Sequence, residues 1–220
     1  MSRPLRLSAF LPLLCLLLGA CIGTRKLSDP TLEIRTEKGS ELGVSTDYGI
    51  VFLGRTASAG RAEITAWFGD GPSVEPVVIE PVGGGLYTAE TEIRLPSVAL
   101  CFDDPRPGEE LIVAGRDANG PWETRVQVCD EPRAFGILTT IPSVLAGRED
   151  QTGAGVFVPD PDDGSRRLLV GLVSGVVRFQ THAGARQYLA VVGPQDLWRL
   201  VTHRRELVKK RRWVYRDDIL

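Results

Sequence analysis

The chain has 220 residues, of which 26 are Lys or Arg and 28 are Asp or Glu, for a formal net charge of -2 at pH 7. This balance excludes the strongly basic composition typical of nucleic-acid-binding domains, so we predict no nucleic-acid partner. A polypeptide of this length can bury one substantial core or two small ones.

Residues 1–20 have the pattern of a secretory signal peptide. Arg3 and Arg6 form a basic start, and residues 7–18 are apolar at all but two positions. The apolar run is too short for a transmembrane helix, which needs roughly 20 apolar residues. We therefore expect residues 1–20 to be removed on export.

The signal pattern ends in a lipobox, Leu18-Gly19-Ala20-Cys21, with small residues directly before a cysteine. This predicts lipidation of Cys21; the alternative is an ordinary cleaved signal with a chance cysteine. Acyl groups contribute about 0.8 kcal/mol per buried methylene and would anchor the protein permanently to a membrane. An aspartate directly after the lipidated cysteine resembles the signal that retains lipoproteins in the inner membrane. Ile22 occupies this position here, so we expect the protein to reside in the outer membrane of the cell envelope. Residues 21–30 are polar and form a predicted tether.

Two cysteines remain in the exported part, because Cys15 leaves with the signal and Cys21 is acylated. Cys101 and Cys129 are an even pair in an oxidising compartment, which predicts a disulfide between them. Closing that loop would stabilise the fold by roughly 3 to 4 kcal/mol on the chain-entropy model. Two buried thiols are the alternative.

A β pattern begins at Leu32 and continues through most of the sequence. Short runs of branched and aromatic residues alternate with clusters of Gly, Pro and Asp, which predicts a sandwich or barrels. The predicted strands include residues 48–53, 62–68, 86–95 and 110–114. The predicted turns include Asp70-Gly71-Pro72, Gly83-Gly84-Gly85, Asn119-Gly120 and residues 159–164.

Only the C-terminal segment has helical periodicity. Leu197, Leu200, Val201 and Val208 recur near helical spacing after Pro194, which predicts an amphipathic helix. The helix carries a basic run at its far end: Lys209, Lys210, Arg211 and Arg212. A solvated helix face explains this run, and contact with anionic lipid headgroups or lipopolysaccharide is the alternative.

Three stretches, in this order, resemble the trypsin-like serine proteases, especially their bacterial glutamyl-endopeptidase-like branch. Residues 97–100 and 107–115 resemble the Asp-Ile-Ala-Leu segment and the following Pro-Gly-Glu strand of the family. Residues 150–158 resemble the Gly-Asp-Ser-Gly-Ser-Gly turn around the nucleophile, and residues 167–175 resemble the next strand, Leu-Val-Gly-Ile-Val-Ser-Gly. Residues 188–198 resemble the last strand and the terminal helix.

The resemblance implies an all-β fold of two packed β-barrels with a C-terminal α-helix. We expect the first barrel in residues 31–118, the second in residues 119–193, and the helix with its basic tail in residues 194–220.

The resemblance also implies that the catalytic triad has been lost. Thr152 stands at the position of the nucleophile, Ser97 at that of the buried aspartate, and Ala59 is the nearest equivalent of the histidine. Asp150 replaces the glycine that shapes the family's oxyanion hole. Acyl transfer in this family needs all three members of the triad.

His182 and His203 are the two histidines of the sequence, and both follow the predicted nucleophile turn, whereas the family's histidine precedes it. Neither suits the role of general base in that topology. Histidines so far apart also give poor evidence for zinc, and we predict no metal, no cofactor and no catalytic residue. The protein is therefore a predicted pseudoprotease.

The first hypothesis for function is a membrane-anchored, non-catalytic binding or interaction module that takes a protein or peptide partner. The second is an immunoglobulin-like sandwich over residues 32–129, with a structural or adhesive role in the envelope. The third is a residual hydrolase that uses Thr152 with an unorthodox base.

Overall fold

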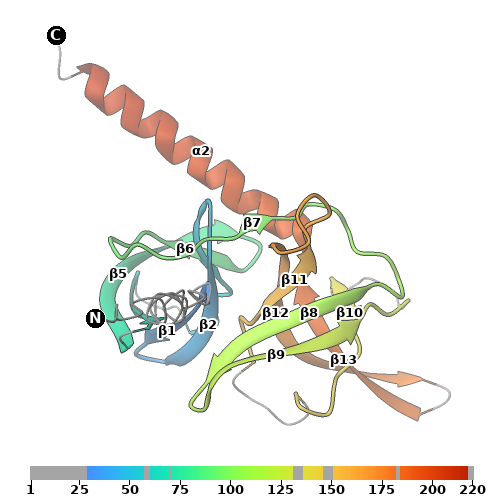
Figure 1. The fold of residues 1–220 in the computed structure, drawn as a ribbon. Coiled ribbons are helices and arrows are strands. Elements are labelled where there is room, and N and C mark those ends of the chain that lie inside the picture. The colour runs from blue at the N-terminus through green and yellow to red at the C-terminus, as the bar shows by residue number, and fades with distance from the viewer. Residues whose placement is uncertain are drawn as a thin grey trace, which may run out of the picture.

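The computed structural model describes residues 29–56, 60–69, 71–130, 136–145, 151–181 and 184–217, with side chains of the terminal helix described as far as Leu207. The predictions made for Cys21, Ala59, Asp150 and His182 lie outside these ranges. In Figure 1 the described residues form two β units side by side, with one long helix running away from them.

The first unit is a closed barrel of six strands in the order β1-β2-β3-β6-β5-β4. Its strands are β1 (Thr31–Thr36), β2 (Gly39–Thr46), β3 (Gly49–Phe52), β4 (Arg61–Phe68), β5 (Gly71–Gly83) and β6 (Leu86–Ala89). Alternation places every second residue of β4 inside, where Ala62 and Ile64 pack with Ile34 and Phe52. Residues 90–95, predicted as part of a strand, lie beyond the end of β6.

The second unit is a seven-stranded sheet whose main path runs β10-β13-β12-β11-β8-β9. Its strands are β7 (Ala99–Leu100), β8 (Glu110–Asp117), β9 (Gly120–Gln127), β10 (Ile137–Thr139), β11 (Gly155–Pro159), β12 (Arg167–Thr181) and β13 (Gly184–Val192). A bridge between Val128 and Thr139 connects the segment after β9 with β10, around a core that includes Leu111, Val156 and Leu189. The predicted pair of β units is confirmed, and the immunoglobulin-like sandwich over residues 32–129 is excluded.

The boundary between the units differs from the expected one. β8 was assigned to the first barrel, but it pairs with β9 and β11 in the second sheet. The expected boundary at residue 118 therefore cuts a β-hairpin at its Asn119-Gly120 turn, which itself favours keeping β8 and β9 together. The first barrel ends with β6, and the second sheet begins with β7.

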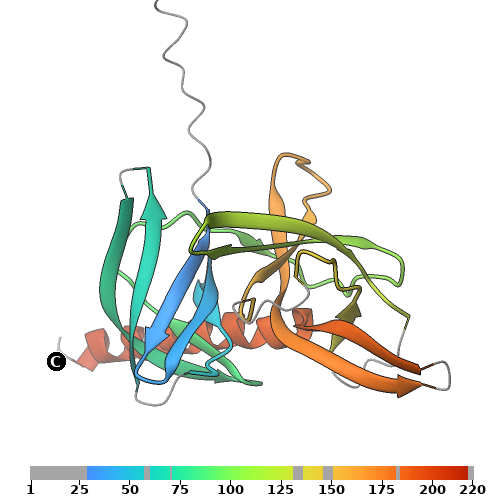
Figure 2. The ribbon, with the colours of Figure 1, turned by 90° about the horizontal axis from the view of Figure 1, so that it is seen from below.

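The helix α2 (Pro194–Asp217) starts at the predicted proline. Its apolar residues Leu197, Leu200 and Val201 are buried in a cluster that also takes Val51 from β3 and Leu172 from β12. Figure 2 shows α2 running behind the first barrel, and the residues of its first turns pack against both units. Among the described residues no helix is long and apolar enough to cross a membrane.

The predicted disulfide between Cys101 and Cys129 is not formed: both are thiols in the structure. Cys101 packs against the interior cluster of the second unit, whereas Cys129 packs against Leu138, Tyr188 and Ala190 on the outer side of β10 and β13. The two sulfur atoms therefore lie on opposite sides of the sheet, where a bond between them would require backbone movement.

Candidate functional site

The turn predicted to match the family's nucleophile turn lies between the two β units. The amide of Leu42 on β2 donates a hydrogen bond of 2.9 Å to the carbonyl of Thr152, and the amide of Gly153 donates one of 2.8 Å to the carbonyl of Val173 on β12. Gly153 has a φ of +83°, and a Cβ there would lie only 1.9 Å from the carbonyl oxygen of Leu42. Only glycine fits this close approach, so the backbone around Thr152 is held from both sides.

The described side chains of this turn, Gln151 and Thr152, have no described partner for proton transfer. Thr152 is partly buried, and its hydroxyl makes no hydrogen bond with any residue that the structure describes. Gln151 is 4% exposed, and its Oε1 has no partner among the described residues. The backbone of the turn is thus held by hydrogen bonds, but no described side chain is placed to take a proton from the Thr152 hydroxyl.

Ser97, expected at the position of the buried aspartate, is exposed and donates a hydrogen bond of 2.5 Å to Oδ1 of Asp47. The backbone next to it is fixed, because Val98 bonds to both Ser45 and Asp47. A hydroxyl engaged with another side chain at the surface cannot hold and stabilise an imidazolium.

The histidine turn was expected near residues 56–60, and Arg55, just before this segment, lies against the second unit. A Cβ on Gly175 of β12 would lie 3.7 Å from Nη1 of Arg55. The sequence pattern did not single out Arg55.

A buried glutamate holds the residue after Arg55. Glu41 on β2 is 5% exposed, and its Oε1 accepts hydrogen bonds of 3.2 Å from the amide and 3.0 Å from the hydroxyl of Thr56. The Thr56 carbonyl in turn accepts a hydrogen bond of 2.6 Å from the hydroxyl of Thr36. The backbone that carries Arg55 is therefore anchored on the first barrel.

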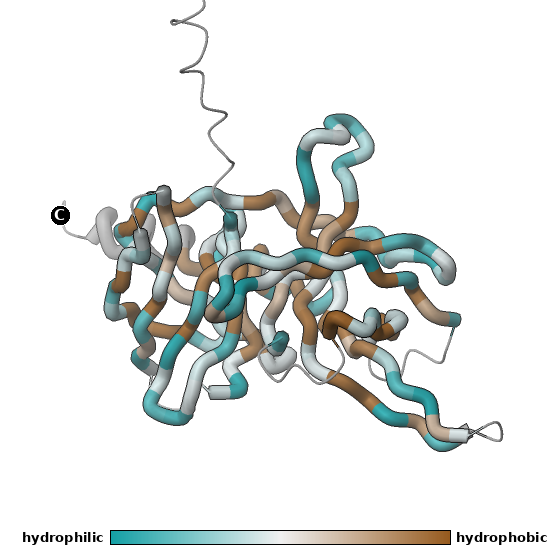
Figure 3. The backbone as a smooth tube through the Cα atoms, turned by 60° about the horizontal axis from the view of Figure 1, so that its bottom comes forward, coloured by the Kyte–Doolittle hydropathy of each residue, from teal (hydrophilic) through white to brown (hydrophobic). Residues whose placement is uncertain are grey.

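Beside Arg55, one edge of β12 lacks a neighbouring strand. β11 pairs with β12 only from Arg167 to Leu172, whereas β13 pairs with β12 as far as Thr181. Residues 174–181 thus have one edge unpaired by any described strand. The ribbon formed with β13 projects from the sheet, and Figure 3 shows it apolar near its base and hydrophilic toward its tip.

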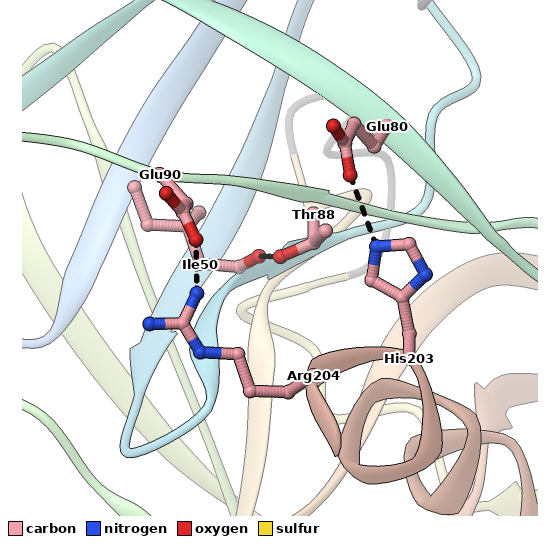
Figure 4. Close-up of polar contacts among 6 residues, drawn as sticks. All are labelled: Ile50, Glu80, Thr88, Glu90, His203 and Arg204. Carbon is pink, nitrogen blue, oxygen red and sulfur yellow. Dashed lines mark hydrogen bonds and ion pairs between the residues drawn. The ribbon is translucent and has the colours of Figure 1, made fainter. Parts of the chain in front are cut away.

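His203, the described histidine, lies in a different place. Its Nε2 is 3.0 Å from Oε2 of Glu80 on β5, and the neighbouring Arg204 pairs with Glu90 (Figure 4). Both pairs border a hollow of about 400 Å³ between α2 and the first barrel, whose floor includes Thr88. The hydroxyl of Thr88 donates to the carbonyl of Ile50 at 2.8 Å, so its proton is directed at the backbone and not at His203.

Solved structures with a similar fold are trypsin-like or related serine protease domains. The MamO protease domain from Magnetospirillum magneticum aligns with a TM-score of 0.56 and 15% identity, over 82% of this chain and 98% of that one. A serine protease of a human pathogenic astrovirus aligns with a TM-score of 0.52 and 10% identity, over 76% of this chain and 91% of that one.

Deg5 aligns with a TM-score of 0.53 and 16% identity, over 80% of this chain and 88% of that one. No protein-family model matches the sequence, and no curated protein is similar to it in sequence. The protein therefore has the two-unit β fold of the trypsin-like serine proteases, as the residue pattern predicted.

Proposed function

We propose that this protein is a non-catalytic peptide-binding module of the cell envelope, built on a trypsin-like fold. One observation carries the proposal: the Thr152 turn is rigidly formed and stands next to an open strand edge, yet the Thr152 hydroxyl has no described proton acceptor.

The chemistry of the fold supports the loss of catalysis. A serine-type hydrolase needs a base that takes the proton of the nucleophile and a carboxylate that orients the base. Ser97 bonds to Asp47 and His203 lies against Glu80, so neither fills these roles at Thr152. Loss of a complete triad lowers kcat by about a million-fold.

The open edge of β12 supports peptide binding. An exposed strand edge presents unpaired N–H and C=O groups, which an extended peptide can satisfy by adding a strand. The hydrogen bonds of such a peptide need no particular side chain, so residues 174–181 can hold peptide backbone of varied sequence.

An activity-based probe tests the proposal directly. We expect a fluorophosphonate to leave the exported protein unlabelled, with the same background as a Thr152→Ala variant. An active trypsin-like enzyme treated in parallel controls for the reagent. Stoichiometric labelling that disappears in Thr152→Ala would establish a residual hydrolase that uses Thr152 and would refute the non-catalytic assignment.

The predicted lipid anchor completes the proposal, with Cys21 as the acylated residue and the outer membrane as the favoured location. Metabolic labelling with a palmitate analogue should mark the wild type and not Cys21→Ser, and fractionation should move Cys21→Ser out of the membrane. Cys15→Ser is the matched control, because it lies in the expected signal. Labelling of Cys21→Ser would refute the anchor.

Contact of Lys209, Lys210, Arg211 and Arg212 with anionic lipid is a further part of this proposal. These four positions lie within α2, which continues to Asp217. Binding of the unlipidated protein to phosphatidylglycerol vesicles should fall with rising salt and on replacing the four residues by Gln. Equal binding of the quadruple variant would refute the contact.

A further inference from the structure

Arg55 is a cation that no described side chain neutralises. It is exposed, and no hydrogen bond or ion pair joins it to a residue that the structure describes. Glu41 anchors the residue that follows Arg55, and the Arg55 guanidinium lies beside β12, with Nη1 3.7 Å from a Cβ position on Gly175. The absence of a side chain on Gly175 leaves room beside this charge.

The guanidinium stands where the open edge of β12 begins. Before Ser174 the edge is closed, since the carbonyl of Val173 accepts a hydrogen bond from the amide of Gly153, and its amide donates one of 2.9 Å to the carbonyl of Ala154. A peptide strand added to residues 174–181 must therefore stop, or leave the sheet, next to Gly175 and Arg55.

Strand direction decides which end of the peptide stops there. β12 is antiparallel to both β11 and β13, and antiparallel pairs are slightly the more stable. A peptide antiparallel to residues 176–181 directs its carboxyl end toward Gly175. The closed edge thus faces the last residues of such a peptide.

We propose that Arg55 recognises a carboxylate at the carboxyl end of a peptide bound along β12, so that the site selects the free carboxyl termini of peptides over internal segments. This inference rests on the proposed peptide binding and adds the ligand's chemistry to it. The planar guanidinium matches a carboxylate with two parallel hydrogen bonds, which is the geometry that makes arginine selective for this group. An acidic side chain near the same end offers the same chemistry.

A peptide array tests the ligand class with the unlipidated exported protein. Each eight-residue peptide is synthesised in three forms: with a free C-terminal carboxylate, with a C-terminal amide, and with an amide after a final glutamate. We expect the free carboxylate form of the bound peptides to bind at least about tenfold more tightly than the plain amide. Preference for the glutamate amide over the free acid would assign the carboxylate to a side chain and refute the selection of free termini.

Substitution of Arg55 links the preference to this residue. Arg55→Gln should bind the free acid and the plain amide equally, and Arg55→Lys should recover part of the preference, because it keeps the charge without the planar fork. Arg61→Gln, at an exposed arginine on β4 of the same barrel, is the control and should bind as wild type. Unfolding midpoints of the variants show whether each is folded.

Hydrogen exchange separates this inference from the function on which it rests. Peptide binding should protect amides within residues 174–181. Protection without a carboxylate preference, or a preference unchanged in Arg55→Gln, would refute the role of Arg55 and leave peptide binding standing. No bound peptide, or binding without protection of β12, would refute the proposed function as well.

Discussion

The carbonyl of Thr152 accepts the amide hydrogen of Leu42 at 2.9 Å, and the next residue, Gly153, has no space for a side chain against the carbonyl of Leu42. The two β units therefore meet backbone to backbone at the Thr152 turn. This contact explains how the turn keeps its shape although its side chains are not arranged for catalysis.

Gly153→Ala should lower the free energy of unfolding by about 3 kcal/mol. The added Cβ would lie 1.9 Å from the carbonyl oxygen of Leu42, and the residue would have to keep a φ of +83°. The steric clash and the left-handed backbone conformation of a non-glycine residue each cost about 1 to 2 kcal/mol. Urea unfolding followed by tryptophan fluorescence measures the change.

Two other glycines separate these costs. Gly60 has a φ of +68° with nothing within 4 Å, and Gly164 has open space and no left-handed backbone. Gly60→Ala should cost about 1 kcal/mol and Gly164→Ala close to nothing. A Gly153→Ala variant no less stable than Gly60→Ala would show that the two units do not press together at this turn.

The fold could be predicted from motifs that occur in the same order as in the trypsin-like proteases. Each of these motifs consists of strand periodicity and turn residues, which can be read from neighbouring residues in the sequence. Residues 150–158 and 167–175 were assigned to a turn and two strands, and the structure places β11 and β12 there. Pairing between strands is not local, which is why β8 was assigned to the wrong unit: its own residues fit an interior strand of either one.

The candidate site was predictable only in part. Thr152 and Ser97 were assigned from motif order, and their catalytic equivalence stays a prediction; the structure places Thr152 in a turn and Ser97 just before β7. The proximity of Arg55 to Gly175 was not predicted, because it joins residues that are far apart in the sequence. The disulfide was predicted from a count of cysteines, and a count carries no information on which side of a strand each thiol lies.

Two polar contacts join α2 to the first barrel, the contact between His203 and Glu80 and the ion pair between Arg204 and Glu90. Replacing both His203 and Arg204 by Gln should speed amide exchange in the helix, with a loss of about 1 kcal/mol in protection, because each partly exposed pair contributes less than about 1 kcal/mol.

The control for the helix is Arg205→Gln, at an exposed arginine whose guanidinium lies over the ring of Trp198 within α2 itself. It should leave the contact between α2 and the barrel unchanged. If the double variant exchanges no faster than Arg205→Gln, the apolar residues Leu197, Leu200 and Val201 alone hold the helix in place.

Glu75 should make stability depend on pH. Burial acts to raise the pKa of Glu75, but hydrogen bonds from the Thr91 hydroxyl and from the amides of Glu92 and Ile93 outweigh it and bring the pKa below its ordinary value of 4.5. A carboxyl whose pKa is lower in the folded state stabilises the fold above the unfolded pKa, and this contribution is lost as pH falls through the folded pKa.

Glu75→Gln should therefore lower the free energy of unfolding by about 1 kcal/mol at pH 7, and by less at the lowest pH at which the protein stays folded, because protonation of the wild-type carboxyl removes its contribution. Chemical unfolding at both pH values measures the difference. Glu63→Gln, at an exposed position on β4, should change stability little at either pH. An equal loss of stability for Glu75→Gln at both pH values would show that the negative charge of Glu75 does not contribute to the free energy of unfolding.

Cys101 should react slowly and should not pair with Cys129. Burial raises the pKa of the Cys101 thiol, so less of it is the reactive thiolate at pH 8, and we expect iodoacetamide to modify it at least about tenfold more slowly than glutathione. Cys101 packs on the inner side of the second sheet and Cys129 on its outer side. After air oxidation of the folded protein and subsequent unfolding, both thiols should therefore still react with a thiol reagent. The unfolding midpoint should be the same with and without reductant.

A disulfide between Cys101 and Cys129 in a digest of the oxidised protein would contradict this prediction. The sheet separates the two sulfur atoms, so such a bond would require a different arrangement of the second unit.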